Sequence, residues 1–282
     1  MPGTFPNAGR RSAALDRRRL LLGLLPVTAA LAGCGRSEGD ERSERPPLAL
    51  VYGGPQGCPD CPSSIATVLR RAPQPFRVTY VGPGTDVALT ADALAEARLY
   101  VQPGGGSDLE GAWRDLRGSA GMLRDWVGEG GSYLGLCFGA YLAGRDPGFD
   151  LLPGDTDGYI DLPDTTIHDA RDTVVPVRWG GRRRHMYFQD GPAFLLDKGA
   201  DADVLATYPN GSAAVVVAPY GKGRVGVSGP HPEADRTWYE NADLENPDGI
   251  RFDLAQELIA KTVAKTVAKT AAKTAAKTVG SR

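Results

Sequence analysis

The stretch that decides the fold is SYLGLCFGAYLAG, residues 132 to 144, in which an apolar run meets a cysteine flanked by glycines. This pattern predicts a buried strand that turns directly into a helix, with Cys137 at the turn. Gly135 and Gly139 leave out side chains that would collide across so tight a reversal. Taken alone, the motif leaves two readings open: a nucleophile at the end of a parallel strand, or an ordinary buried thiol.

Upstream of this turn, strand-like and helix-like segments alternate. Strands are expected at 48–54, 76–82 and 98–106, and helices at 63–71, 90–97 and 120–131, the second of these capped by Thr90. Strands and helices that alternate at this spacing predict a parallel sheet with helices on both faces.

The sequence pattern changes from about residue 158 to 230, where short β-rich segments are separated by Gly, Pro, Asn and Asp. These segments predict antiparallel strands, with a hairpin turn at 220–223. A final amphipathic helix is expected at 251–260. The last β segment is expected to end at the same sheet edge as the Cys137 turn.

Two further segments carry candidate functional groups. His231 and Glu233 follow the last β segment two residues apart, so in an extended chain they share a face and the carboxylate can orient the imidazole. Gly104, Gly105 and Gly106 follow another strand, and their bare N–H groups are candidates for an oxyanion hole with the amide of Phe138.

Together these motifs resemble the class I glutamine amidotransferase-like superfamily, whose catalytic triad is Cys, His and Glu. The particular resemblance is to the N-terminal domain of eukaryotic-type biotin–protein ligases. It is carried by Val51 to Pro55, Pro103 to Gly105, Tyr133 to Tyr141 and Ser228 to Glu233. It implies an α/β, flavodoxin-like three-layer sandwich over residues 48–260, with a mostly parallel central sheet and a β-rich C-terminal half.

The resemblance also implies roles for individual residues. Cys137 would be the nucleophile, His231 the base and Glu233 its orienting carboxylate, with Gly105 and Phe138 as oxyanion donors. The expected function is cysteine-dependent hydrolysis of a small-molecule or peptide amide, with no cofactor and no metal. The alternative is a catalytically inactive binding or scaffold protein that keeps the same pocket.

One position departs from the family pattern. Amidotransferases commonly carry a glutamine two residues after the second glycine of the elbow, and this chain has Tyr141 there. The sequence also lacks the Gly-rich biotin and ATP loop of a ligase, so biotin ligation is not expected. Ordinary glutamine chemistry is not expected either.

Residues 1–33 are expected to be a signal peptide. Five arginines precede an apolar run of 13 residues, which ends in Leu31-Ala32-Gly33-Cys34. This ending resembles the lipobox of a bacterial lipoprotein, which implies a fatty-acylated Cys34 (diacylglycerol, palmitate) and a protein held on the extracytoplasmic face of the cell membrane. Arg17 to Arg19 also resemble a twin-arginine signal. A non-cleaved membrane anchor is the alternative.

The segments on either side of the domain are polar or low in complexity. Residues 34–47 are charged and end in Pro-Pro, which predicts a flexible tether. Residues 261–282 repeat Lys-Thr with small residues, which predicts a solvated tail whose candidate partners are anionic surfaces. Since the chain has a net charge of −2 while its leader and tail are basic, the domain between them is acidic and predicts no specific nucleic-acid binding.

Cys58 and Cys61 form a Cys-x-x-Cys pair before an expected helix. Outside the membrane such a pair is typical of a small structural disulfide, while a redox motif and half of a zinc site are the alternatives. Its place on a loop at the carboxyl edge of the sheet predicts that it lies near Cys137. A redox gate on that thiol is therefore a further hypothesis.

Overall fold

The structure is a computed structural model that describes residues 45–145 and 147–264. The predicted leader with Cys34, most of the tether and most of the Lys-Thr tail lie outside these residues. Within the described ranges no helix is long and apolar enough to cross a bilayer.

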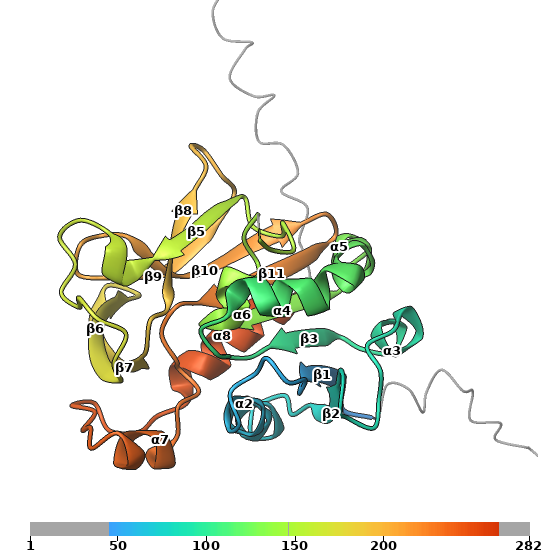
Figure 1. The fold of residues 1–282 in the computed structure, drawn as a ribbon, viewed down its shortest axis with the longest axis horizontal. Coiled ribbons are helices and arrows are strands. Elements are labelled where there is room, and N and C mark those ends of the chain that lie inside the picture. Colours follow the sequence, from blue (N-terminus) through green and yellow to red (C-terminus); the bar gives the residue numbers. More distant parts are fainter. Residues whose placement is uncertain (1–44, 146, 265–282) are drawn as a thin grey trace, which may run out of the picture. The chain divides into compact units, whose positions relative to one another are not determined.

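Eleven strands of the described residues form one sheet (Figure 1). They are β1 (Leu48–Tyr52), β2 (Arg77–Val81), β3 (Leu99–Gln102), β4 (Ser132–Leu136), β5 (Gly154–Gly158), β6 (Thr173–Trp179), β7 (Arg182–Phe188), β8 (Pro192–Leu196), β9 (Asp203–Thr207), β10 (Ala213–Tyr220) and β11 (Gly223–Ser228). The main path runs β2-β1-β3-β4-β11-β10-β9-β6-β7, while β8 pairs with β10 and β5.

Seven α-helices accompany the strands in the described residues. They are α2 (Cys61–Arg70), α3 (Ala91–Ala95), α4 (Leu109–Leu116), α5 (Ala120–Gly128), α6 (Phe138–Tyr141), α7 (Arg236–Asn241) and α8 (Asp253–Val263). Two short 3-10 helices lie at Arg117–Ser119 and Tyr159–Asp161.

The sheet is mixed, so the expectation of a mostly parallel, flavodoxin-like sheet is not confirmed. Strands β2, β1, β3, β4 and β11 pair in parallel. The remaining pairings are antiparallel. The physical reason lies in the connections. Helices join β1 to β2, β2 to β3 and β3 to β4, whereas Gly-rich turns join β6 to β7 and β10 to β11 directly, and a hairpin is necessarily antiparallel.

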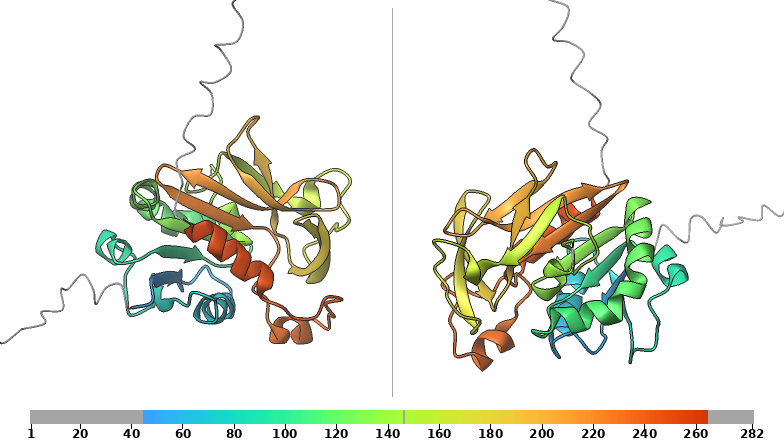
Figure 2. Two further views of the ribbon diagram at one scale, coloured as in Figure 1. Left: turned by 180° about the vertical axis from the view of Figure 1, so that it is seen from behind. Right: turned by 45° about the horizontal axis from the view of Figure 1, so that its top comes forward.

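Helices cover both faces of the parallel strands. On one face, Ile65 of α2 and Leu258 of α8 pack in the same buried cluster as Val51. In the view from behind, α8 lies across this face of the strands (Figure 2). On the other face, Leu94 of α3 and Leu123 of α5 pack with residues of the alternate strand positions. Since neighbouring strand residues point to opposite faces, one run of apolar residues fills both layers of the core.

Local signals placed several elements correctly. The Thr90 hydroxyl accepts a hydrogen bond from the Ala93 N–H at 3.2 Å, as expected of a helix cap. The hairpin turn lies between Tyr220 and Gly223, which pair across it. Helix α8 ends three residues past the predicted domain boundary, at Val263. The start of the Lys-Thr repeat thus belongs to the domain, because Thr262 is fully buried.

Candidate functional site

Cys137 lies at the sharp turn between β4 and α6. Its backbone has φ 48° and ψ −105°, a conformation that residues other than glycine rarely adopt. The Cys137 N–H donates to the Ser228 carbonyl of β11 at 2.8 Å, which fixes the turn against the neighbouring strand. The side chain is 8% exposed. This is the geometry expected of a nucleophile elbow.

Two glycines make this turn sterically possible. A methyl group at Gly139 would lie 2.6 Å from the backbone carbonyl carbon of Gln102 at the end of β3, and one at Gly135 would lie 2.7 Å from the carbonyl carbon of Gly139. Real side chains do not approach backbone atoms so closely. The helix after Cys137 therefore packs directly on the ends of the strands, as the sequence predicts.

His231 and Glu233 form a buried pair just beyond β11. The His231 Nδ1 and Glu233 Oε1 atoms are 2.8 Å apart, and the two side chains are 4% and 0% exposed. Since a carboxylate only accepts hydrogen bonds, Nδ1 carries the proton and Nε2 remains for Cys137. The His231 N–H also donates to the Tyr187 carbonyl at 2.8 Å, which holds the backbone of the pair in place.

The surroundings of His231 favour its protonated form. Burial alone would lower its pKa, but the charges of Glu233 and Cys137 and hydrogen bonds to both outweigh burial and raise the pKa to about 10. A charged imidazole beside a thiol is the arrangement from which cysteine hydrolases form a thiolate–imidazolium pair. In this structure the Cys137 Sγ also lies 3.4 Å from the Gln189 carbonyl oxygen, to which it donates.

The predicted oxyanion donors lie on either side of Cys137 in sequence and meet in space. A methyl group at Gly105 would lie 2.6 Å from the Phe138 ring. The Gly105 loop is held by an antiparallel bridge to the segment before α2, in which Cys58 N–H donates to Gly104 O and Gly106 N–H to Gln56 O, both at 3.2 Å. This bridge does not use the Gly105 N–H, which makes no backbone hydrogen bond to another residue of the described ranges.

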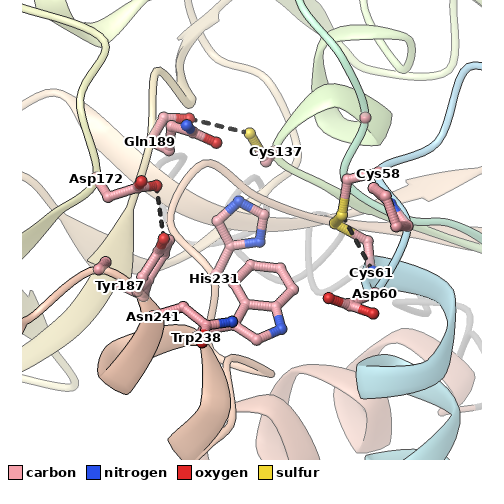
Figure 3. A pocket seen from close by; sticks show the side chains of 13 residues that line it. Cys58, Asp60, Cys61, Cys137, Asp172, Tyr187, Gln189, His231, Trp238 and Asn241 are labelled. Carbon is pink, nitrogen blue, oxygen red and sulfur yellow. Dashed lines mark hydrogen bonds between the residues drawn. A yellow bond between two sulfur atoms is a disulfide. The ribbon is translucent and has the colours of Figure 1, made fainter.

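Two cavities open beside Cys137 and share Gly105 and Gln189 in their walls. The first, of about 270 Å³, is lined by Cys137, Gly105 and His231 and also by the disulfide (Figure 3). The second, of about 370 Å³, is lined by Cys137 and Gly105 together with Phe138 and Tyr141. The thiol thus lies where two ligand-sized spaces meet.

An aromatic frame around His231 was not predicted from the sequence. The Trp238 ring of α7 lies 4.9 Å from the imidazole, centre to centre, and its Nε1 donates to the Ser64 hydroxyl of α2 at 3.0 Å. The Tyr187 ring lies 6.0 Å from the imidazole, and its hydroxyl donates to Asp172 at 2.5 Å. The sequence does contain a signal for α7, because Asp235 caps this helix by accepting from the Thr237 N–H at 2.9 Å.

Tyr141, at the position of the amidotransferase glutamine, lines the second cavity. Its hydroxyl donates to the Asp190 carbonyl at 3.2 Å. Burial and then the nearby charge of Asp190 raise its pKa well above the usual value, so the phenol stays protonated. A tyrosine held in this way occupies space that the shorter glutamine side chain would leave to a substrate.

Cys58 and Cys61 form a disulfide in the structure, with their Cα atoms 5.4 Å apart. The bond lines the first cavity together with Cys137 and His231 (Figure 3). A methyl group at Gly104 would lie 2.7 Å from the Cys61 Sγ and 2.9 Å from the His231 Cε1, so this loop is packed between the disulfide and the imidazole. The disulfide therefore supports the loop that carries Gly105.

Replacing both Cys58 and Cys61 by serine is expected to lower the free energy of unfolding by about 2 kcal/mol, from the entropy of closing so short a loop. Because the loop beside Cys137 is loosened, we also expect iodoacetamide to alkylate Cys137 a few-fold faster. The measurements are urea denaturation and mass spectrometry of the Cys137 peptide. Treatment with a dithiol should accelerate the alkylation of Cys137 to the same extent in the wild type and not at all in the double variant. An alkylation rate that the dithiol changes in neither protein would contradict the redox-gate hypothesis.

Neither His168 nor His185 lines the two cavities beside Cys137. His185 pairs with Asp248, its Nδ1 3.3 Å from the carboxylate, and His168 is exposed, with its Nδ1 3.5 Å from the Thr165 hydroxyl. In the described ranges no group of three or more His, Cys, Asp or Glu side chains is arranged to hold a metal ion.

Comparisons with known proteins support the family resemblance in part. A family model described as "Biotin-protein ligase, N terminal" matches residues 48–156, a region that contains Gly105 and Cys137 but ends before His231. The fold is similar to that of a chain in the structure of PurLQS from Thermotoga maritima, with a TM-score of 0.53, 16% identity, and coverage of 78% of this chain and 98% of that one. No curated protein matches the chain in sequence.

Two further solved structures are similar at TM-scores below 0.5. A glutamine amido transferase from Methylobacillus flagellatus has a TM-score of 0.47 and 14% identity, covering 77% of this chain and 85% of that one. Gan42B, a β-galactosidase from G. stearothermophilus in its E323A form, has a TM-score of 0.44 and 16% identity, covering 79% of this chain and 31% of that one. At 16% identity, the likeness to the PurLQS chain concerns the fold alone.

Proposed function

We propose that this protein is a cysteine-dependent amide hydrolase in which Cys137, His231 and Glu233 form the catalytic triad. The observation that carries the proposal is the buried His231–Glu233 pair, 2.8 Å apart, whose imidazole lines the same cavity as a cysteine at a strained strand-to-helix turn. Steric strain at such a position persists only where the surrounding structure enforces it, and it is common at active sites.

The geometry supports a two-step acyl transfer. The Cys137 thiolate attacks the carbonyl carbon, and the N–H groups of Gly105 and Phe138 stabilise the oxyanion. As the C–N bond breaks, His231 gives its proton to the leaving amine, and a thioester to Cys137 remains. His231 then takes a proton from water, whose oxygen attacks the thioester and releases the carboxylic acid and the free thiol.

Tyr141 supports a substrate other than glutamine. Its buried phenol takes the position of the glutamine that commonly binds substrate in amidotransferases, and its hydrogen bond to the Asp190 carbonyl keeps it in the second cavity. The proposal also includes attachment to the extracytoplasmic face of the membrane through a lipid on Cys34. The Leu31-Ala32-Gly33-Cys34 motif supports this attachment, and it lies outside the described residues.

A second candidate is a binding or scaffold lipoprotein without turnover. It is favoured by the hydrogen bond from the Cys137 thiol to the Gln189 carbonyl at 3.4 Å, because a thiol that donates there keeps its proton. The same pocket would then bind a ligand without forming a thioester.

The two candidates are separated by a panel of fluorogenic amide, peptide and γ-glutamyl substrates tested on the wild type and on Cys137→Ser. For a hydrolase we expect amine release by the wild type alone, with an acyl adduct on the Cys137 peptide in a rapidly quenched sample. A folded Cys137→Ser variant, checked by circular dichroism, is the control.

Alkylation of Cys137 by iodoacetamide provides a readout that needs no substrate. A reaction faster than that of a free thiol, and slowed in His231→Ala, supports the hydrolase. If alkylation of Cys137 is slow and does not depend on His231, and if no substrate is hydrolysed, the hydrolase is contradicted and the binding protein is supported.

A further inference from the structure

The first cavity contains two acidic and two aromatic side chains beside the candidate triad. Asp60 and Asp172 lie on opposite sides of it, and Trp238 and Tyr187 form part of its wall (Figure 3). Among the described residues that line either cavity there is no lysine or arginine. Apart from the His231 imidazole, whose charge is paired with Glu233, the lining of the pocket therefore offers negative charge and aromatic rings and no lysine or arginine to hold a carboxylate.

The two carboxylates are not neutralised by neighbours in the described ranges. Asp172 accepts a hydrogen bond from the neutral Tyr187 hydroxyl, and neither Asp172 nor Asp60 forms an ion pair with a described residue. Arg171, next to Asp172 in sequence, binds Asp169 instead, with a nitrogen–oxygen distance of 2.7 Å. The negative charge of this wall is thus available to a ligand.

The position of His231 tells which half of the substrate enters this cavity. His231 lines the first cavity and is absent from the walls of the second, whereas Phe138, an oxyanion donor, lines only the second. In acyl transfer the imidazole protonates the leaving amine, so the amine half must lie on the His231 side. The acyl half then extends past Phe138 and Tyr141 into the second cavity.

We infer that the amine half of the substrate carries a positive charge, as in amides of diamines or of basic amino acids. This inference rests on the proposed hydrolase, because it assigns the first cavity to the leaving group. Carboxylates pair with ammonium and guanidinium groups, and the faces of Trp and Tyr attract cations. A leaving group with a carboxylate would meet two like charges, and the charged His231 imidazole is already paired with Glu233.

The test uses three five-carbon probes that differ only in charge: pentane-1,5-diamine, pentane-1,5-diol and pentanedioate. Each is added to the full-length protein, and the slowing of Cys137 alkylation by neutral iodoacetamide is followed by mass spectrometry. We expect the diamine to protect Cys137 at a concentration at least about tenfold lower than the diol, and pentanedioate not to protect.

Two variants identify the charges that matter. In Asp172→Asn the advantage of the diamine over the diol should fall about fivefold, and in Asp60→Asn by a similar factor. Each rate is normalised to that of the same variant without probe. Asp92→Asn is the matched control, because this exposed aspartate of α3 lines neither cavity and should leave the advantage unchanged.

The outcomes for the two proposals are distinct, since protection measures binding and not turnover. Equal protection by diamine and diol, or better protection by pentanedioate, overturns the cationic amine half. If the diamine protects selectively but no amide of pentane-1,5-diamine is hydrolysed in a Cys137-dependent way, the hydrolase fails and the cation site stands. Cys137-dependent hydrolysis without preference for a charged amine would leave only the hydrolase.

Discussion

In a Glu233→Gln variant, Cys137-dependent hydrolysis is expected to fall by about 10²- to 10⁴-fold. The wild-type carboxylate is completely buried and accepts the Nδ1 proton of His231 at 2.8 Å. A glutamine amide of the same size can instead donate to Nδ1, which moves the imidazole proton to Nε2 and leaves no base facing the thiol. Iodoacetamide alkylation of Cys137 should slow as well.

The same variant should change the titration of His231. In the wild type the pKa is raised from its ordinary 6.5 to about 10. Without the Glu233 charge, the burial that lowers the pKa gains weight, and the midpoint should move to lower pH. The measurement is NMR of the His231 Cε1 proton, compared with the signals of His168 and His185.

The sign of the effect on stability follows from this shift. A raised pKa stabilises the folded wild type fully below about pH 6.5, and this contribution is lost as the pH rises through about 10. The wild type should therefore lose more free energy of unfolding between pH 7 and pH 10 than Glu233→Gln does, as measured by urea denaturation.

Glu257→Gln is the matched control, since it makes the same substitution at a carboxylate that accepts from the Trp179 Nε1 at 2.9 Å and lines none of the cavities that contain Cys137 or His231. It should leave the alkylation rate of Cys137 unchanged. If Glu233→Gln alkylates and hydrolyses at the wild-type rate with His231 titrating near 10, Glu233 does not orient the base.

The second large effect is expected for the Gly139→Ala variant, whose free energy of unfolding should fall by about 3 kcal/mol. For a domain of this size, such a loss lowers Tm by roughly 6–12 °C. The added methyl group would lie 2.6 Å from the carbonyl carbon of Gln102, and backbone on both sides leaves no flexible side chain to move away. Relief requires α6 to shift from β3, which displaces Cys137. Differential scanning calorimetry and Cys137 alkylation measure the two consequences.

Gly121→Ala serves as the control for this prediction. Gly121 lies within α5, and a methyl group there would have no neighbour within 4 Å. Since alanine favours a helix over glycine by about 1 kcal/mol, this variant should be as stable as the wild type or more so. If Gly139→Ala were equally stable, the contact between α6 and β3 would not depend on the missing side chain.

The sequence predicted those parts of the fold that depend on near neighbours in the chain. Apolar runs closed by glycines located β1, β3 and β4, and the glycine spacing around Cys137 located the elbow, because these patterns reflect local backbone geometry. The spacing of His231 and Glu233 suggested a pair for the same reason. His231 and Glu233 are only two residues apart, so a short extended segment is enough to bring their side chains into contact.

The rest of the site depends on contacts that no local pattern encodes. Trp238 reaches Ser64 from the far end of the chain, and Asp172 reaches the first cavity from the loop before β6. The end of α8 was missed for a different reason. Thr262 belongs to a repeat whose composition predicts a solvated tail. Its side chain is nevertheless buried, and its hydroxyl donates to the Leu258 carbonyl at 2.7 Å.

The pairing of β4 with β11 has a consequence for how the molecule folds. Cys137 follows the first of these strands and His231 the second, and the whole antiparallel half of the sheet is made between them. Contacts so distant along the chain form late, since the entropy of closing the long intervening segment must be overcome first. Until β11 docks, Cys137 has neither its base nor the Ser228 carbonyl that holds its backbone. In the proposed hydrolase, a chain that has not yet formed this pairing therefore lacks the complete triad.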